Sequence, residues 1–130
     1  MKKLHLLFNH TLTPEQIKNA KESLGVSKEN IITLPENLNK IWSNIPPDCT
    51  LNLINHLKPI AEYFSKQNKN DYVLVQGDFG AVNYMVNVLK NYDLIPVYST
   101  TERHIIEEKN ENNEIIIKRY FKHICFRKYQ

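Results

Sequence analysis

Glycine is scarce in this chain of 130 residues, and the only three are Gly25, Gly77 and Gly80. The dinucleotide-binding fingerprint requires three glycines within six residues, and the P-loop requires two glycines followed by lysine. Neither spacing occurs here. The sequence therefore excludes both of these common nucleotide-binding motifs.

Metal-ligating and catalytic patterns are equally sparse. The two cysteines, Cys49 and Cys125, are not spaced as metal ligands, and neither are the five histidines. There is no GxSxG elbow, no HExxH motif and no convincing carboxylate pair. We therefore predict no metal ion and no cofactor. The N-terminus lacks the pattern of a signal sequence or a membrane span, which predicts a cytoplasmic protein without membrane association.

Neither positive nor negative charge predominates in the chain as a whole, because the formal net charge is only +3. An apolar content of 42% and a charged content of 24% are those of an ordinary globule, which predicts a single domain over residues 1–130. Acidic residues are nevertheless absent after Ile115, where lysine and arginine alternate with tyrosine and phenylalanine. This basic run fits either a surface that stacks bases and pairs phosphates or a hairpin with one solvated face.

The clearest local pattern is a strand that turns into a helix between Asp71 and Leu89. Residues 72–75 are β-branched, aromatic or aliphatic, as in a strand buried on both faces, and apolar residues from Ala81 onward cover most of a helix. A turn through Gly77 and Gly80 would present free backbone N–H groups to an anion. The same glycines also fit a purely structural tight turn, and Asp78 fits a helix cap at least as well as a catalytic role.

The rest of the chain alternates between strand and helix patterns. Residues 3–8 and 31–34 read as strands, and the first is followed by a helix that Thr13, Pro14 and Gln16 should begin and Gly25 should end. Residues 53–64 form one helical face, which Pro59 should kink or divide into two short helices. Residues 94–98 read as a fourth strand, placed towards a sheet edge by Pro96. Such alternation predicts an α/β fold with a mainly parallel sheet flanked by helices.

The last third should form an antiparallel β-hairpin around the polar turn 110–113. If Asn110 pairs with Asn113, then Ile106 faces Ile117, Arg103 faces Tyr120, and Thr100 faces His123. A single bulge would shift this register.

Candidate site residues follow from the rule that the carboxyl ends of parallel strands share one rim of the sheet. The set is rich in hydrogen-bond donors and suits a phosphate-bearing ligand. It comprises Asn9, His10, Thr11, Gln76, Asp78, Phe79, Ser99, Thr100, Thr101 and Arg103, with His123 and Arg127 brought near by the hairpin. Ser99, Thr100 and Thr101 also fit a simpler role as strand formers.

Several stretches resemble the small CRISPR-associated proteins of type III systems, including stand-alone ring nucleases. The resemblance lies in Val75-Gln-Gly-Asp-Phe-Gly-Ala81, in Ile95-Pro-Val-Tyr-Ser-Thr-Thr101 with Arg103, and in residues 11–16, 41–48 and 121–129. It implies a minimal Rossmann-like domain that acts as a homodimer. It also implies a ligand, cyclic oligoadenylate and chiefly cyclic tetra-adenylate, which such enzymes linearise to switch off type III CRISPR signalling.

This ligand suggests roles for the rim residues. Cleavage needs no metal in principle, because a ribose 2′-hydroxyl can attack its neighbouring phosphate. Arg103 and the backbone of Gly77–Gly80 would hold the phosphate, Thr100 and Thr101 would orient it, and His123 would serve as acid or base. Gln76 or Asn9 would bind adenine edges or ribose hydroxyls, and Phe79 and Tyr98 would offer stacking surfaces. His10, Asp78, Ser99 and Arg127 complete the expected ligand-binding set.

Two other interpretations stay open from the sequence. The first is a non-catalytic sponge or sensor that holds the cyclic nucleotide, since capture and cleavage need nearly the same rim. The second is a small RNA- or DNA-binding domain that uses the basic hairpin. The ring-nuclease interpretation predicts no stable complex with long nucleic acid.

Overall fold

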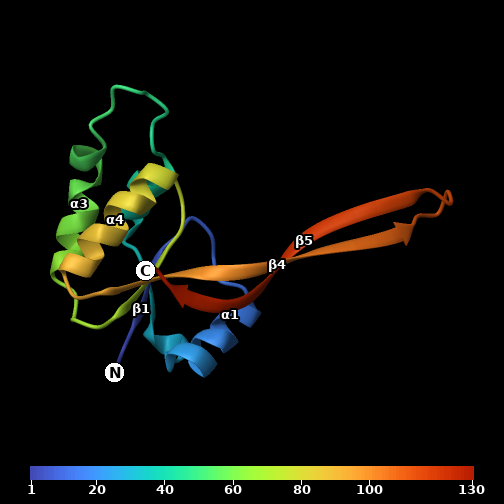
Figure 1. Cartoon of the computed structure of the whole chain (residues 1–130), viewed down its shortest axis with the longest axis horizontal. Helices are drawn as coiled ribbons and strands as arrows, with labels where there is room; N and C mark the ends of the chain where they lie inside the picture. Colours follow the sequence, from blue (N-terminus) through green and yellow to red (C-terminus); the bar gives the residue numbers. More distant parts are fainter.

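The computed structural model describes all 130 residues, as a five-stranded mixed sheet with helices on both faces and a long hairpin that projects from it (Figure 1). The strands are β1 (Leu4–Leu7), β2 (Ile31–Thr33), β3 (Tyr72–Val75), β4 (Ile95–Lys109) and β5 (Ile115–Lys128). The helices are α1 (Pro14–Asn19), α2 (Glu36–Ser43), α3 (Leu53–Ser65) and α4 (Phe79–Asn91). A π-helical turn, η1 (Ala20–Leu24), continues α1, and a 3-10 turn, η2 (Lys28–Asn30), precedes β2.

The strand order is β2-β1-β3-β4-β5. The first four strands are parallel, and β5 returns antiparallel to β4. The prediction of an α/β fold with a mainly parallel sheet and a C-terminal hairpin is therefore confirmed. No helix is long and apolar enough to cross a membrane.

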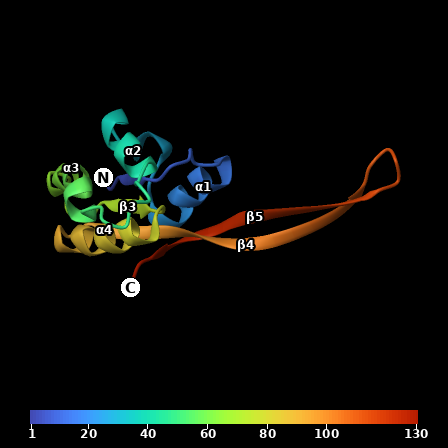
Figure 2. The same cartoon turned by 90° about the horizontal axis from the view of Figure 1, so that it is seen from above.

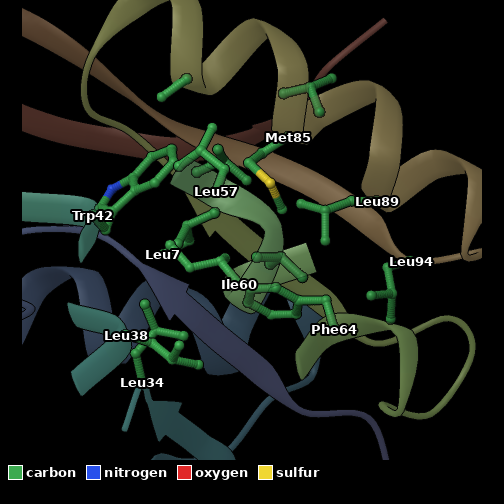
Figure 3. Close-up of a cluster of buried hydrophobic side chains, with 14 residues drawn as sticks. Leu7, Leu34, Leu38, Trp42, Leu57, Ile60, Phe64, Met85, Leu89 and Leu94 are labelled. Carbon is green, nitrogen blue, oxygen red and sulfur yellow. The ribbon is translucent and has the colours of Figure 1, made fainter. Parts of the chain in front are cut away.

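Side chains alternate between two cores along the central strands. Leu7, Val73 and Val75 pack with α2, α3 and α4, around Trp42 and Phe64 (Figure 3). On the other face, Leu4, Leu6 and Leu74 pack with residues of η1 and β5, including Ala20 and Phe126. Because the period of a strand is two residues, a four-residue strand can supply both layers. The sheet is thus covered on both sides over its parallel half.

Helix α1 begins as its sequence predicts. The Thr13 hydroxyl accepts a hydrogen bond from the Gln16 backbone N–H at 3.2 Å, and the Gln16 side chain accepts one from the Thr13 N–H at 2.9 Å. This reciprocal capping box satisfies two N–H groups that the first turn leaves free. Gly25 ends the π-helical continuation with φ of +69°, a left-handed conformation that glycine adopts without strain.

Of the two outcomes expected from Pro59, a kink or a division into two short helices, the division does not occur. A single helix, α3, runs from Leu53 to Ser65 with Pro59 inside it. The Asn52 side chain caps its start by accepting from the Asn55 N–H at 3.1 Å, and Leu57, Ile60 and Phe64 bury its inner face. Burial of this apolar face offsets the one backbone hydrogen bond that proline removes.

The fourth strand lies towards a sheet edge, as Pro96 predicts, but it is not the edge strand itself, because β4 lies between β3 and the edge strand β5. On the side of β3, the Ile95 N–H donates to the backbone carbonyl of Asp71. On the side of β5, the Pro96 carbonyl accepts from the Tyr129 N–H at 3.0 Å. Pro96 therefore directs its missing N–H towards the end of β5, where regular pairing stops at Lys128. An interior strand tolerates proline at such a position.

The predicted hairpin register is wrong by one residue. Thr101 pairs with His123, Arg103 with Phe121 and Ile106 with Lys118, and the ladder is irregular between Ser99 and Thr101. The length of the loop sets this register. The Asn110 N–H donates to the Glu114 carbonyl, and Asn113 adopts φ of 62°, so the loop has three residues rather than two.

A β-bulge shifts the register by one further residue at the base of the hairpin, where Ile124 and Cys125 of β5 lie opposite the single residue Thr100 of β4. The Thr100 hydroxyl accepts from the Cys125 N–H at 3.2 Å and lies 3.1 Å from the Cys125 carbonyl. Thr100 therefore does not face His123.

We call residues 101–123 the arm. Both views show it extending as two strands away from the helices and the parallel sheet (Figures 1 and 2). Eight of the eleven exposed large hydrophobic residues belong to it or adjoin it: Ile105, Ile106, Ile115, Ile116, Ile117, Tyr120, Phe121 and Ile124.

Candidate functional site

A groove of about 540 Å³ lies between the first turn of α1 and the base of the arm. The capping box of α1 fixes one wall, with Thr13, Glu15 and Gln16. The other wall consists of Ser99 and the base of the arm: Thr101, Tyr120, Phe121, Lys122 and His123. Four of these residues are consecutive in β5, so the groove also follows the outer edge of this edge strand, where residues of both faces line it. Strand pairing brings β4 and β5 together here although they are distant in sequence.

His123 is the centre of this groove. Its Nδ1 lies 2.5 Å from the Ser99 hydroxyl, and its Nε2 lies 2.9 Å from Oδ1 of Asn19. An amide oxygen only accepts, so Nε2 carries the ring proton and Nδ1 accepts from the serine hydroxyl. The Gln16 amide approaches the same hydroxyl at 3.5 Å. Three elements, α1, β4 and β5, thus meet in one hydrogen-bonded chain from Asn19 through His123 to Ser99.

Burial lowers the pKa of His123 below its ordinary value of 6.5, and the Glu15 carboxylate opposes this shift weakly. The imidazole is therefore mainly neutral at pH 7, which is the form that accepts a proton. Phe126, whose ring centroid lies 4.6 Å away, supplies part of the apolar surroundings. A neutral imidazole paired with a hydroxyl can act as a general base.

The two faces of the arm differ, because side chains alternate along each strand. The groove face continues the groove outwards and carries, besides Thr101 and His123, Arg103, Ile105, Glu107, Lys109, Ile115, Ile117, Arg119 and Phe121. The back face carries Glu102, His104, Ile106, Glu108, Ile116, Lys118, Tyr120 and Lys122. Arg103 belongs to the groove face and forms no ion pair within the chain.

Four of the predicted rim residues lie together in a second, smaller hollow. Asn9, His10, Gln76 and Gly77 line a hollow of about 170 Å³ with Phe8, between the carboxyl ends of β1 and β3. The order of the sheet reverses between these two strands, which is where open α/β sheets bind ligands. Gln76 connects the two places, because its side-chain oxygen accepts from the Ser99 N–H at 2.7 Å.

The turn after β3 is less available to an anion than the sequence indicated. Asp78 caps α4 by accepting from the Ala81 N–H at 3.0 Å, so a carboxylate already uses one of the free N–H groups there. Trp42 donates to the Gln76 carbonyl at 3.0 Å, and a Cβ on Gly77 would lie 3.0 Å from its indole. The capping role of Asp78 is confirmed, and Gly77 is required by the tryptophan.

The remaining predicted residues lie apart from the groove. Tyr98 points to the opposite face of β4, where its hydroxyl accepts from Arg127 at 2.9 Å and its ring packs on Tyr129 with centroids 4.8 Å apart. Phe79 is 95% exposed at the start of α4, next to Gly80. Thr100 is engaged with Cys125. The rim predicted as one site is therefore divided among several places.

Sequence reasoning missed Asn19 and gave Gln16 only a capping role. Asn19 ends α1 where the π-helical turn begins, and π-helical turns often occur at functional sites. No sequence pattern connects residues 104 positions apart, so only the fold could place Asn19 on His123. No group of histidine, cysteine and acidic residues could hold a metal ion.

The chain matches the model of the family described as the Uncharacterized protein MJ1673 family over residues 2–127. A relative from Methanocaldococcus jannaschii, described as Uncharacterized protein MJ1673, is 50% identical over 130 residues, which are 99% of this chain and 98% of the relative. No solved structure matches the chain.

Proposed function

We propose that this chain, which belongs to the MJ1673 family, binds cyclic oligoadenylate in the groove between α1 and the arm and linearises it without a metal ion. The ligand class comes from the resemblance to ring nucleases, and cyclic tetra-adenylate is the ring we expect. Such an enzyme acts in the cytoplasm, where it removes the messenger that activates type III CRISPR effectors. The observation that carries the chemistry is the neutral His123 held between Ser99 and Asn19.

A Rossmann-like relationship fits the same ligand. The parallel order β2-β1-β3-β4, with helices on both faces, supports it. The hollow at the reversal point, with Asn9, His10 and Gln76, suits a base or ribose, while the groove face suits phosphates. Gln76 joins the two places, so one large ring could occupy both.

Both nitrogens of His123 are engaged, so the proton of a ribose 2′-hydroxyl must reach it through Ser99. The 2′-hydroxyl passes its proton to the Ser99 oxygen while the serine proton moves to Nδ1 of His123. The 2′-oxygen then bonds to the neighbouring phosphorus, and the bond from phosphorus to the 5′-oxygen breaks. The imidazolium returns its proton to that oxygen, which leaves a 2′,3′-cyclic phosphate and a 5′-hydroxyl.

Arg103 supplies the positive charge nearest to this chain of groups on the groove face. It lies four residues beyond Ser99 along β4, or about 13 Å of extended strand. Arg103 and the Gly77–Gly80 turn would therefore hold different phosphates of the ring rather than one. A ring with rotational symmetry also suits a two-fold homodimer that presents the same groove twice.

Incubation of the purified protein with labelled cyclic tetra-adenylate in EDTA tests the proposal. We expect linear products ending in a 2′,3′-cyclic phosphate, formed over many turnovers per protein molecule. Stoichiometric retention without linear products would instead make the protein a sponge. Salt-sensitive binding of linear RNA, with no binding of the ring, would identify a nucleic-acid-binding domain.

A further inference from the structure

The back face of the arm has no covering element in the chain. Beyond its base, the arm is a ribbon of two strands, and such a ribbon is only marginally stable alone in water. Ile106, Ile116 and Tyr120 are 39%, 40% and 44% exposed on this face. A contiguous apolar surface of this kind marks an interaction site.

The two faces differ in charge. Among its paired residues the groove face has three cations and one acid, namely Arg103, Lys109, Arg119 and Glu107. The back face has two of each sign, namely Lys118, Lys122, Glu102 and Glu108. The groove face therefore suits an anion, whereas the back face suits a surface of mixed charge. Apolar side chains are exposed on both faces, and Ile105, Ile115, Ile117 and Phe121 of the groove face are the more exposed.

Charge is also segregated along the arm. The inner part, residues 101–106 and 118–123, has four cations and one acid, and the outer part, residues 107–117, has four acids and one cation. Two arms that lie antiparallel across a two-fold axis place each outer part on the other's inner part. An isologous interface requires this self-complementarity.

We propose that the back face binds the back face of a second copy of this chain, with the two arms antiparallel about an axis beside Ile106. This inference rests on the proposed function for the homodimer and names the surface that forms it. In this alignment Ile106 meets its counterpart, Ile116 meets the partner's Tyr120, and Lys122 meets the partner's Glu114. Lys118 lies near the axis with its charge already paired to Glu108 of its own arm at 3.0 Å.

The alignment leaves the groove face of each arm free for ligand, and the dimer contacts Tyr120 and Lys122 lie at the border of the groove, which they also line. Neither Lys122 nor Glu114 forms an ion pair within its own chain. The two rings of the back face, His104 and Tyr120, are already stacked on each other with centroids 5.2 Å apart. The glutamates of the outer arm would repel phosphates. A second copy of the chain therefore fits this surface better than a nucleic acid.

Neighbouring isoleucines on opposite faces provide a matched test. Sedimentation equilibrium of the unliganded protein should show a dimer for the wild type. Ile106→Glu should raise the dimer dissociation constant by at least about 100-fold, because it buries an unpaired charge twice. Ile105→Glu, which changes the groove face, should leave the constant within about threefold. A monomeric wild type, or equal effects of the two substitutions, would overturn the proposal.

A charge exchange tests the alignment with variants that keep the apolar surface. Lys122→Glu and Glu114→Lys should each weaken the dimer by about tenfold, and the double variant should restore it. Additive weakening in the double variant would refute the antiparallel alignment. No cyclic nucleotide is present in these assays, so a back-face dimer that does not cleave the ring would contradict only the proposed function.

Discussion

His123 shows at the scale of one residue how the fold sets a protonation state. Two hydrogen bonds fix the tautomer of its ring, and burial lowers its pKa. Its sequence neighbourhood is basic, with Lys122 beside it, and gave no sign of this pairing. The chemistry of the groove depends on keeping the imidazole neutral.

We expect the cleavage rate to fall at low pH, because the proposed base, His123, must be neutral to accept a proton. Activity should stay constant through neutral pH and fall only as the pH drops below 6.5 towards the lowered pKa of His123. Asn19→Asp should place a carboxylate on Nε2, favour the imidazolium, and move this acid limb to higher pH by about one unit.

The matched control is Asn55→Asp on the exposed start of α3, which should leave the pH profile unchanged. An Asn19→Asp profile identical to that of the wild type would show that Asn19 does not position His123.

At the scale of elements, the turn from β3 into α4 is held against α2 by Trp42. The indole is only 1% exposed and leaves no room for a side chain on Gly77. Gly80 differs, because a Cβ there would meet Leu53 and Asp78 at the ordinary distances of 3.4 and 3.5 Å. The two glycines therefore have different reasons to be present.

Gly77→Ala should lower the free energy of unfolding by about 1–3 kcal/mol, because either Trp42 or the strand must shift. Gly80→Ala lies in the first turn of α4 and should change the free energy of unfolding by less than about 1 kcal/mol, in the stabilising direction. Urea denaturation measures both. Equal destabilisation by the two substitutions would contradict the role assigned to Trp42.

Local patterns predicted those elements whose causes are local. The capping box at Thr13, the cap at Asp78 and the terminator at Gly25 each depend on residues within a few positions, and all three are present. The errors arose where tertiary contacts decide. Pro96 is interior because its missing N–H points past the end of β5, and the hairpin register depends on Asn113 and on the bulge at Thr100.

At the scale of the molecule, the candidate site was only partly predictable. The rule of strand carboxyl ends grouped Asn9, His10 and Gln76, which line one hollow, but it also included Thr100, whose hydroxyl is engaged with Cys125. The sequence contained a basic hairpin, yet its two unlike faces emerged only from the register. One face continues the groove, and the other is the face that we propose binds a second chain.

The central claim is that His123 removes a proton during cleavage of a cyclic nucleotide in the groove. Single-turnover cleavage of cyclic tetra-adenylate in EDTA should be about 10²- to 10⁴-fold slower in His123→Gln, with ring affinity little changed. His56→Gln, which alters a histidine on α3, should cleave at the wild-type rate. Wild-type cleavage by His123→Gln, in protein that binds the ring normally, would contradict the account.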